Sequence, residues 1–316
     1  TPVPQPAQSG LFAAIPDPTQ PAAPVVKSDQ AAEVASLDNA LNNPDFTSVF
    51  APIDPQASRK KMAKQAGVEP VILMEHVTKI YPAQPNKPAL DDINIEIYPG
   101  EFVFLVGHSG SGKTTLLNCI SCYIPIDSGE IMLGDRQLAN LSEDALAKVR
   151  NRQLGFVFQD FLLLDGLTVR ENILLPAIIG GAVTGQTEAR ADQLCDVFGI
   201  SAIRDKYPAE ISGGEKQRTA VARALINHPL LILADEPTGN LDSKSSRAVI
   251  RSFEQAKESL EATIFMVTHD SFAASFCDRV VILRDGVVWR TLEKGATDRT
   301  AFQDQLLDAI RDMGKE

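Results

Sequence analysis

The sequence lacks several features that would place it in common protein classes. The uncharged stretch 172–187 is too short to cross a membrane as a helix, and it is interrupted by Pro176 and by Gly180-Gly181. Positive charge is also scarce, because 30 lysines and arginines face 41 aspartates and glutamates, which gives a net charge of −11. Proteins that bind nucleic acid usually carry a basic excess, so we expect no nucleic-acid partner.

Cysteine is rare, with four residues in a chain of 316. Cys119 and Cys122 form a C-x-x-C pair, but no second pair exists to complete a zinc site. Both follow a glycine-rich loop and lie among leucines and isoleucines, so packing in a buried helix explains them better than metal or redox chemistry. This cysteine usage favours a reducing, cytoplasmic compartment.

Prolines concentrate at the beginning of the chain. Residues 1–68 contain ten prolines and only three aromatic residues. Such a segment buries too little apolar surface to offset its conformational entropy, so we expect a flexible extension here. It is either a solvated tail or an arm that binds a partner or a membrane surface. We expect the folded domain over residues 69–295 and an amphipathic C-terminal helix over residues 296–316.

From Val71 onward the pattern is typical of an α/β fold. Ile93, Ile95 and Ile97 alternate with polar residues, which predicts a half-exposed antiparallel strand. A turn at 284–286 between two apolar runs predicts a hairpin. Residues from about 162 to 225 read as a mostly helical insertion. Continuous apolar runs predict strands buried on both faces at 102–106, 155–158, 230–234 and 263–267.

A phosphate-binding loop follows the first of these buried runs and opens a helix. It reads Gly107-His108-Ser109-Gly110-Ser111-Gly112-Lys113-Thr114. Its glycines let backbone N–H groups point at phosphates, Lys113 reaches the β- and γ-phosphates, and the Thr114 hydroxyl binds Mg²⁺. A purely structural glycine turn would not require this strand–loop–helix context. The motif predicts ATP and Mg²⁺ as cofactors, bound by Gly107, Ser109, Gly110, Ser111, Gly112, Lys113, Thr114 and Thr115.

An acidic pair, Asp235-Glu236, ends a later apolar run. We expect this strand to lie beside the strand that leads into the phosphate loop. Asp235 would then hold Mg²⁺, usually through water. Glu236 would orient and deprotonate the water that attacks the γ-phosphate. Both carboxylates could instead simply cap the strand, but the apolar run before them and Pro237 after them disfavour this alternative.

A second glycine-rich turn lies between these two motifs. It reads Ile211-Ser212-Gly213-Gly214-Glu215 and opens a helix of its own, which provides another anion site. The first loop already holds the phosphates of its own nucleotide. We therefore expect the second turn to meet nucleotide on another copy of the chain, in an ATP-driven homodimer.

In this order, the motifs resemble the ATPase domain of ABC transporters from Val71 to about Glu293. The resemblance implies a P-loop NTPase (RecA-like) core, an antiparallel β subdomain and a helical signature subdomain at about 162–225. It implies that Ser212, Gly213 and Gly214 meet the γ-phosphate bound to the opposite subunit. It also assigns adenine stacking to Tyr81, sensing of Mg²⁺ and attacking water to Gln159, a dimer-crossing loop to Asp242, and a γ-phosphate hydrogen bond to His269.

Some residues depart from the common family pattern. Ile211 and Glu215 replace the usual leucine and glutamine of the signature, and 238–240 read Thr-Gly-Asn rather than the common Ser-Ala loop. The 238–240 loop, with the run 172–176, resembles the subfamily of macrolide exporters, lipoprotein extractors, cell-division ATPases and bacitracin-type ATPases. Within it, 158–161, 172–176 and 298–300 are most similar to the peptide-resistance group.

The resemblance implies a peripheral ATPase subunit at the cytoplasmic face of the cell membrane. Its partner would be a separate integral membrane permease, contacted through residues 160–163, in antimicrobial-peptide resistance or export. The main alternative is the ATPase of a lipoprotein-releasing or cell-division complex that regulates a membrane partner without transport. An ATPase acting on ribosomes or DNA fits less well, because those proteins usually carry two such domains or coiled-coil insertions. A kinase would have no use for the signature turn.

Overall fold

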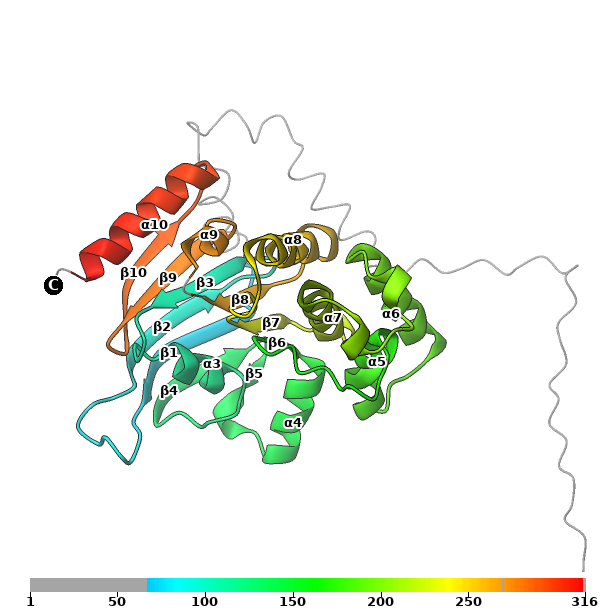
Figure 1. The fold of residues 1–316 in the computed structure, drawn as a ribbon. Coiled ribbons are helices and arrows are strands. Elements are labelled where there is room, and N and C mark those ends of the chain that lie inside the picture. The colour runs from blue at the N-terminus through cyan, green and yellow to red at the C-terminus, as the bar shows by residue number, and fades with distance from the viewer. Residues whose placement is uncertain (1–66, 269, 315–316) are drawn as a thin grey trace, which may run out of the picture. The chain divides into compact units, whose positions relative to one another are not determined.

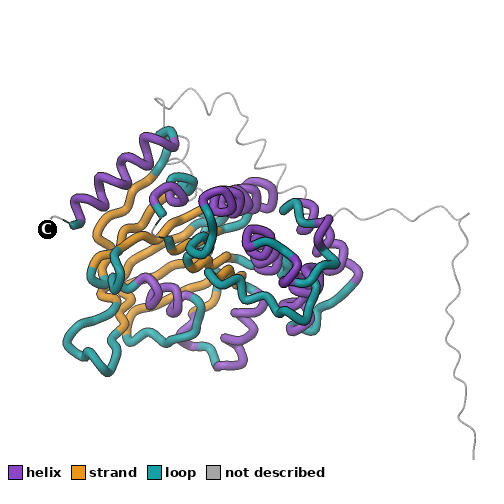
Figure 2. The backbone as a smooth tube through the Cα atoms, viewed as in Figure 1, coloured by secondary structure: helices purple, strands orange, loops and turns teal. Residues whose placement is uncertain are grey.

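The computed structural model describes residues 67–268 and 270–314. The predicted extension over residues 1–68 therefore lies almost entirely outside the described residues, and so does His269. Within the described part, the strands form two sheets that are flanked by helices (Figures 1 and 2). This arrangement confirms the predicted mixed α/β class.

The smaller sheet is antiparallel, with the strand order β2-β1-β4-β5. The predicted alternation is confirmed in β2, where Ile93, Ile95 and Ile97 are buried while Asp92 and Asn94 are exposed. One side of this strand therefore faces the core and the other faces solvent. The four strands are β1 (Ile72–Lys79), β2 (Leu90–Ile97), β4 (Ser128–Leu133) and β5 (Arg136–Gln137).

The larger sheet has the order β10-β9-β3-β8-β7-β6. All its neighbouring strands are parallel except β9 and β10, which form the predicted hairpin. The strands predicted to be buried on both faces are found here. The sheet comprises β3 (Phe102–Gly107), β6 (Leu154–Phe158), β7 (Leu231–Asp235), β8 (Ile264–Val267), β9 (Arg279–Arg284) and β10 (Val287–Glu293).

One expectation about this sheet is wrong. The acidic strand β7 does not lie beside the phosphate-loop strand β3, because β8 pairs with both of them and separates them. Helix α8 connects β7 to β8, and this crossover places β8 next to β7 in the sheet. The carboxyl ends of parallel strands still meet at one edge, so the acidic pair and the phosphate loop remain on the same side of the sheet.

Eight α-helices are described. Helices α5, α6 and α7 come between β6 and β7, in the segment read as mostly helical, and short 3₁₀ turns occur at 138–140, 201–203 and 208–210. The helices are α3 (Lys113–Ile120), α4 (Glu143–Arg152), α5 (Val169–Ile179), α6 (Gly185–Val197), α7 (Gly213–Leu225), α8 (Ser243–Leu260), α9 (Ser271–Ala274) and α10 (Arg299–Met313).

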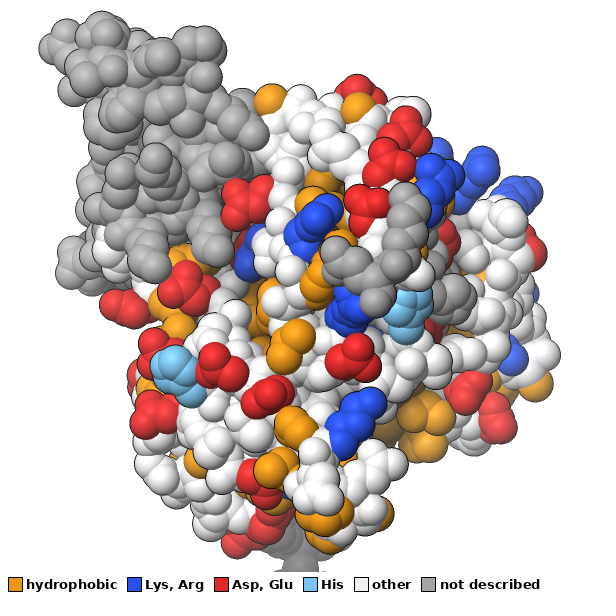
Figure 3. Space-filling view, turned by 90° about the vertical axis from the view of Figure 1, so that its left-hand side faces the viewer, with side chains coloured by type: hydrophobic (Ala, Val, Ile, Leu, Met, Phe, Trp, Pro, Cys, Tyr) orange, Lys and Arg blue, Asp and Glu red, His pale blue; other side chains and the backbone are white. Residues whose placement is uncertain are grey.

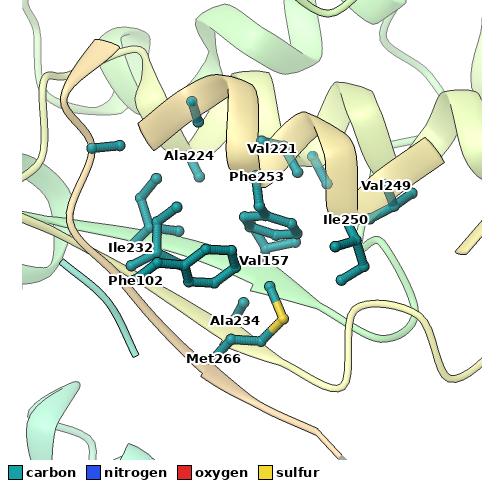
Figure 4. Packing of buried hydrophobic residues seen from close by; sticks show 14 of the residues in the cluster. Phe102, Val157, Val221, Ala224, Ile232, Ala234, Val249, Ile250, Phe253 and Met266 are labelled. Atoms are coloured by element: carbon teal, nitrogen blue, oxygen red, sulfur yellow. The ribbon is translucent and has the colours of Figure 1, made fainter. Parts of the chain in front are cut away.

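Alternate residues of β3 belong to different hydrophobic clusters. Phe102 and Phe104 pack in a cluster with α7, α8 and α10, whereas Val103 and Leu105 pack with α3 and the smaller sheet. Figure 4 shows how side chains of α7 and α8, including Phe253, converge on the strands of the larger sheet. Because both faces of β3 are packed, the loop at its end starts from a rigid support.

Two further observations concern the surface of the described part and its helices. On the side that carries α10 and β10, acidic, basic and hydrophobic side chains are interspersed, and the visible described residues form no continuous basic patch (Figure 3). Among the residues that the structure describes, no helix combines the length and the apolar character needed to span a membrane.

Candidate functional site: a nucleotide cavity and a separate signature turn

The phosphate loop connects β3 to α3 and is shaped by its surroundings. Gly112 precedes the first residue of α3 with φ of 101°, a backbone conformation that strongly favours glycine. A Cβ atom on Gly112 would lie 2.5 Å from the carbonyl oxygen of Ala89. A Cβ atom on Gly107 would lie 2.3 Å from the carbonyl oxygen of Leu283. The glycines are thus required by close backbone contacts and by the left-handed backbone at Gly112.

Lys113 is folded back onto this loop. Its Nζ donates hydrogen bonds to the carbonyl oxygens of Gly107 at 2.7 Å and His108 at 2.8 Å. Burial lowers the pKa of the Lys113 ammonium, while the nearby Glu236 and Asp235 oppose that shift. The ammonium is therefore positioned over the loop next to two carboxylates, where a negatively charged ligand would strengthen its charged form.

The phosphate loop opens onto a cavity of about 550 Å³. Residues at the carboxyl ends of β6 and β7, distant in the sequence, complete its walls, so the fold brings most of the predicted site residues together. Ala89 and Val267 also line the cavity, and neither carries a chemical group that sequence reasoning could have detected. The predicted residues around it are Gly107, Ser109, Gly110, Gly112, Lys113, Thr114, Thr115, Gln159, Asp235 and Glu236.

The acidic pair reaches the cavity from the end of β7. Burial raises the pKa of Asp235, the neighbouring Glu236 raises it further, and Lys113 counteracts both effects. Glu236 has φ of 47°, in the left-handed region that residues other than glycine seldom occupy. Its backbone N–H donates to the carbonyl oxygen of Val267 at 2.9 Å and thereby fixes this conformation. Such local strain is typical of residues whose direction matters for function.

The oxygen-bearing side chains around the cavity fit a magnesium ion. Thr114, Gln159 and Asp235 offer a hydroxyl, an amide oxygen and a carboxylate. Among the described residues, no group of three or more histidines, cysteines or carboxylates could hold a metal on its own. Magnesium does not require such a cage, because it is commonly bound by one or two carboxylates together with water and substrate phosphates.

The segment that follows Gln159 has an unusual backbone. Phe161 and Leu162 have φ of 61° and 48°, two consecutive left-handed residues that are not glycine. The guanidinium of Arg223, on α7, donates to both of their carbonyl oxygens, at 2.8 Å in the case of Phe161. Burial lowers the pKa of Arg223. Further along, the buried Asn172 side chain bonds to four backbone groups of residues 164–168. This segment is therefore tied to α7 and to the start of α5.

Seven of the predicted site residues are not among the described residues that line the cavity, and three of them, Ser111, Tyr81 and His269, belong to neither the signature turn nor the Asp242 loop. Ser111, within the phosphate loop, is buried and is not among the residues that line the cavity. Tyr81 lies at the rim, 39% exposed, with its hydroxyl oxygen 3.5 Å from the hydroxyl oxygen of Thr115. His269 lies outside the described residues.

The signature turn does not line this cavity. Ser212 precedes α7 and forms a capping box with Glu215. The Glu215 carboxylate accepts hydrogen bonds from the Ser212 backbone N–H at 2.8 Å and from its hydroxyl at 2.7 Å. The hydroxyl bond, followed by the backbone bond, lowers the pKa of Glu215. In the isolated chain, the polar groups of Ser212 are therefore satisfied by a neighbouring residue.

The loop that carries Asp242 lies against the signature turn. Asp242 caps α8 by accepting from the backbone N–H groups of Lys244 at 2.9 Å and Ser245 at 3.0 Å. A Cβ atom added to Gly214 would meet Ser245 at 3.4 Å. Asp242 does not line the cavity either. The two predicted dimer-contact motifs thus form one surface outside the cavity.

A glycine loop between a buried strand and a helix, facing an acidic pair across a polar cavity, defines a P-loop ATPase. Residues 90–239 match the family model described as ABC transporter. The chain is 48% identical over 226 residues to an uncharacterized ABC transporter ATP-binding protein, YvcR, of Bacillus subtilis, spanning 72% of this chain and 87% of that protein. It is 46% identical over 228 residues to the bacitracin export ATP-binding protein BceA of Halalkalibacterium halodurans, spanning 72% and 90% of the two chains.

The chain therefore belongs to the ABC transporter family, and it is an ATP-binding subunit with ATPase activity, as the sequence predicts. It also resembles a solved dimeric structure of the ATP-binding cassette MJ0796 bound to ADP and Pi. That similarity has a TM-score of 0.62 and 38% identity, and it covers 70% of this chain and 98% of the solved one.

Proposed function

We propose that two copies of this chain close head to tail around two molecules of MgATP and transmit that closure to a separate membrane permease. The observation that carries the proposal is the division of the predicted site. The phosphate loop, Gln159, Asp235 and Glu236 surround one cavity, whereas Ser212 and its neighbours lie outside it. A second copy would bring its signature turn to the open side of the cavity.

Within one subunit, the phosphate loop would bind the triphosphate. The N-terminus of α3 and the loop N–H groups favour an anion there, and Lys113 would exchange its bonds to loop carbonyls for bonds to phosphate. Tyr81 at the exposed rim would stack on adenine. Glu236 would act as the base for the attacking water, and His269 would bind the γ-phosphate. Thr114, Gln159 and Asp235 would hold Mg²⁺, which neutralises phosphate charge when bound.

Across the dimer interface, Ser212, Gly213 and Gly214 would meet the γ-phosphate bound to the other subunit. They lie at the start of α7, where the helix dipole attracts an anion. Asp242, on the neighbouring loop, would cross the same interface. Because hydrolysis removes this contact, the nucleotide state would set the population of the closed dimer.

A separate hollow supports the proposed permease contact. It lies between α4, α5 and β6, has a volume of about 370 Å³, and is mostly apolar. Three large hydrophobic side chains around it are notably exposed: Ile179 at 70%, Tyr123 at 57% and Leu162 at 55%. Contiguous exposed apolar groups favour an interaction surface. We propose that a cytoplasmic helix of the permease binds here, beside residues 160–163, which would place the chain at the cytoplasmic face of the membrane.

For the biological role, we propose peptide-antibiotic resistance or export. Its support is the 46% identity to a protein named for bacitracin export, over nearly the full length of that protein. Deletion of the gene for this chain should then make the cell more sensitive to peptide antibiotics that act on the cell envelope. If sensitivity stays unchanged and the chain instead co-purifies with a division-type membrane protein and cell-wall hydrolases, the regulatory alternative replaces this role.

Crosslinking between copies tests the shared site. A mixture of Ser109→Cys and Ser212→Cys proteins should form an intermolecular disulfide when MgATP is added. The native thiols will interfere little, because all four are buried. Burial raises the pKa of Cys119 to about 12 and the pKa values of Cys122 and Cys195 to about 11. Ser142→Cys, at the start of α4, is the matched control for Ser212→Cys. A crosslink to position 142 instead, or none to 212, would contradict the head-to-tail arrangement.

A further inference from the structure

Three polar side chains form a connected line at the ends of β6 and β7. Asn240 Nδ2 donates to the carboxylate of Asp160 at 2.7 Å. Gln159 Nε2 donates to Asn240 Oδ1 at 3.1 Å. Asn240 lies in the turn after Glu236, and the other two residues directly follow β6. A single asparagine thus joins the segment carrying the proposed base to the segment carrying Gln159.

The hydrogen-bonding capacity of Asp160 gives this line a direction. A carboxylate offers only acceptor oxygens, so Asn240 must present its NH₂ group to Asp160. The Asn240 oxygen then faces Gln159, which must present its own NH₂ group in turn. That leaves the Gln159 oxygen, rather than its nitrogen, available to the cavity that Gln159 lines.

The turn also fixes the position of the Gln159 side chain. A Cβ atom on Gly239 would lie 3.1 Å from both Cδ and Nε2 of Gln159. Glycine at this position therefore lets the amide approach the turn closely. Residues 239 and 240 together determine where the amide group lies and which way it points.

We propose that Asp160 and Asn240 form an orienting relay that turns the Gln159 oxygen toward the cation in the cavity. This rests on the proposed function, in which that cavity holds Mg²⁺ beside ATP. Direction matters there, because magnesium binds oxygen ligands and an NH₂ group would present partial positive charge to it. Asn240 is a positioning residue: it acts through Gln159.

Metal affinity, measured separately from hydrolysis, tests the relay. All variants carry Glu236→Gln to suppress turnover, and Mn²⁺ replaces Mg²⁺ so that free metal can be followed by electron paramagnetic resonance. With saturating ATP, Gln159→Ala and Asn240→Ala should each weaken Mn²⁺ binding by a similar factor, about three- to tenfold. The double variant should lose no more than either single variant, because both changes remove the same interaction. ATP affinity in the presence of EDTA should not change.

A swap of the two partners provides a rescue. Asn240→Asp alone places two carboxylates side by side and should weaken Mn²⁺ binding. Adding Asp160→Asn lets the new asparagine donate to position 240, whose carboxylate again accepts from Gln159, so the affinity should recover. Asn94→Ala is the matched control. Asn94 is likewise exposed and joins two residues, accepting from His76 N at 2.9 Å and donating to the Asp92 carbonyl oxygen at 2.8 Å.

Three results would overturn the relay. Asn240→Ala could leave the Mn²⁺ affinity unchanged, or it could weaken that affinity by the same factor when residue 159 is already alanine. The third is a swap of residues 160 and 240 that fails to restore the Mn²⁺ affinity. In these cases the Glu236→Gln parent still binds Mn²⁺ with ATP, and the proposed cation site survives. If ATP does not promote Mn²⁺ binding even in the parent protein, the cation site itself is wrong and the relay falls with it.

Discussion

The phosphate loop and the signature turn both place a serine and glycines at the start of a helix, yet they differ in what surrounds them. The phosphate loop faces a cavity that its own chain encloses with Gln159, Asp235 and Glu236. The signature turn lies outside that cavity, and Ser212 bonds to Glu215 of its own helix. The phosphate loop therefore faces the carboxylates proposed for hydrolysis within its own chain. The signature turn offers a serine hydroxyl for binding but lies next to none of these carboxylates.

Similar local structure at two helix starts of this chain thus accompanies different surroundings and different proposed roles. In both places the proposed ligand would have to displace an internal partner: loop carbonyls for Lys113 and a carboxylate for Ser212. Lys113 would exchange neutral partners for a charged one, which favours binding by a single chain. Ser212 would exchange one charged partner for another, so in the proposed dimer the gain would come from the whole interface. Four substitutions separate the two motifs experimentally.

Glu236→Gln should have the largest effect, on chemistry alone. Removal of the proposed base should slow ATP hydrolysis about 10²- to 10⁴-fold while both binding motifs remain intact. Phosphate release measures the rate, and size-exclusion chromatography with MgATP should reveal a long-lived dimer. Glu261→Gln is the control, because Glu261 shares the left-handed backbone, with φ of 52°, but does not line the cavity. Hydrolysis by Glu236→Gln at the wild-type rate would remove this residue from the role of base.

Lys113→Ala should disable the phosphate-loop half of the site. Loss of a partly buried ammonium beside the phosphates should weaken ATP binding roughly 100-fold or more. Isothermal titration calorimetry with ATP measures the affinity, and Lys148→Ala, an exposed lysine on α4, should bind normally. Unchanged affinity in Lys113→Ala would refute the assignment of the phosphate loop.

Ser212→Ala should disable only the signature half. ATP should still bind to each chain, but in the Glu236→Gln background the ATP-dependent dimer should weaken by about tenfold, because one phosphate contact per site is lost. The change also removes a helix cap worth about 1 kcal/mol, so the experiment needs a control for the loss of folding stability. Ser142→Ala removes the comparable cap of α4 and should leave dimerisation intact. Equal losses in both variants would assign the effect to folding instead.

Glu215→Gln should have the smallest effect and the opposite sign. A glutamine can still accept from the Ser212 backbone N–H, but it removes a negative charge from beside the incoming phosphate. We expect an ATP-dependent dimer that is about three- to tenfold tighter in the Glu236→Gln background. Analytical ultracentrifugation with ATP measures the change. A weaker dimer would mean that the carboxylate supports the contact instead of competing with it.

The sequence predicts the chemistry of this protein better than its spatial arrangement. Strand, glycine loop and helix are contiguous, so the phosphate loop could be located residue by residue. The neighbour of β7 was predicted wrongly, because pairing between strands that are distant in the chain leaves no local signal. Likewise, Asn240 stood out only as a departure from a common loop. Its contact with Gln159 depends on the packing of two turns that are 81 residues apart in the sequence.

The hold of Arg223 on the segment after Gln159 has a mechanical consequence. Phe161 and Leu162 keep an uncommon backbone shape while their carbonyl oxygens are bonded to this side chain, and Leu162 borders the apolar hollow. Arg223 lies near the end of the helix that Ser212 begins. If the proposed permease pushes on Leu162, these bonds would pass the force to α7 and so toward Ser212 at its other end.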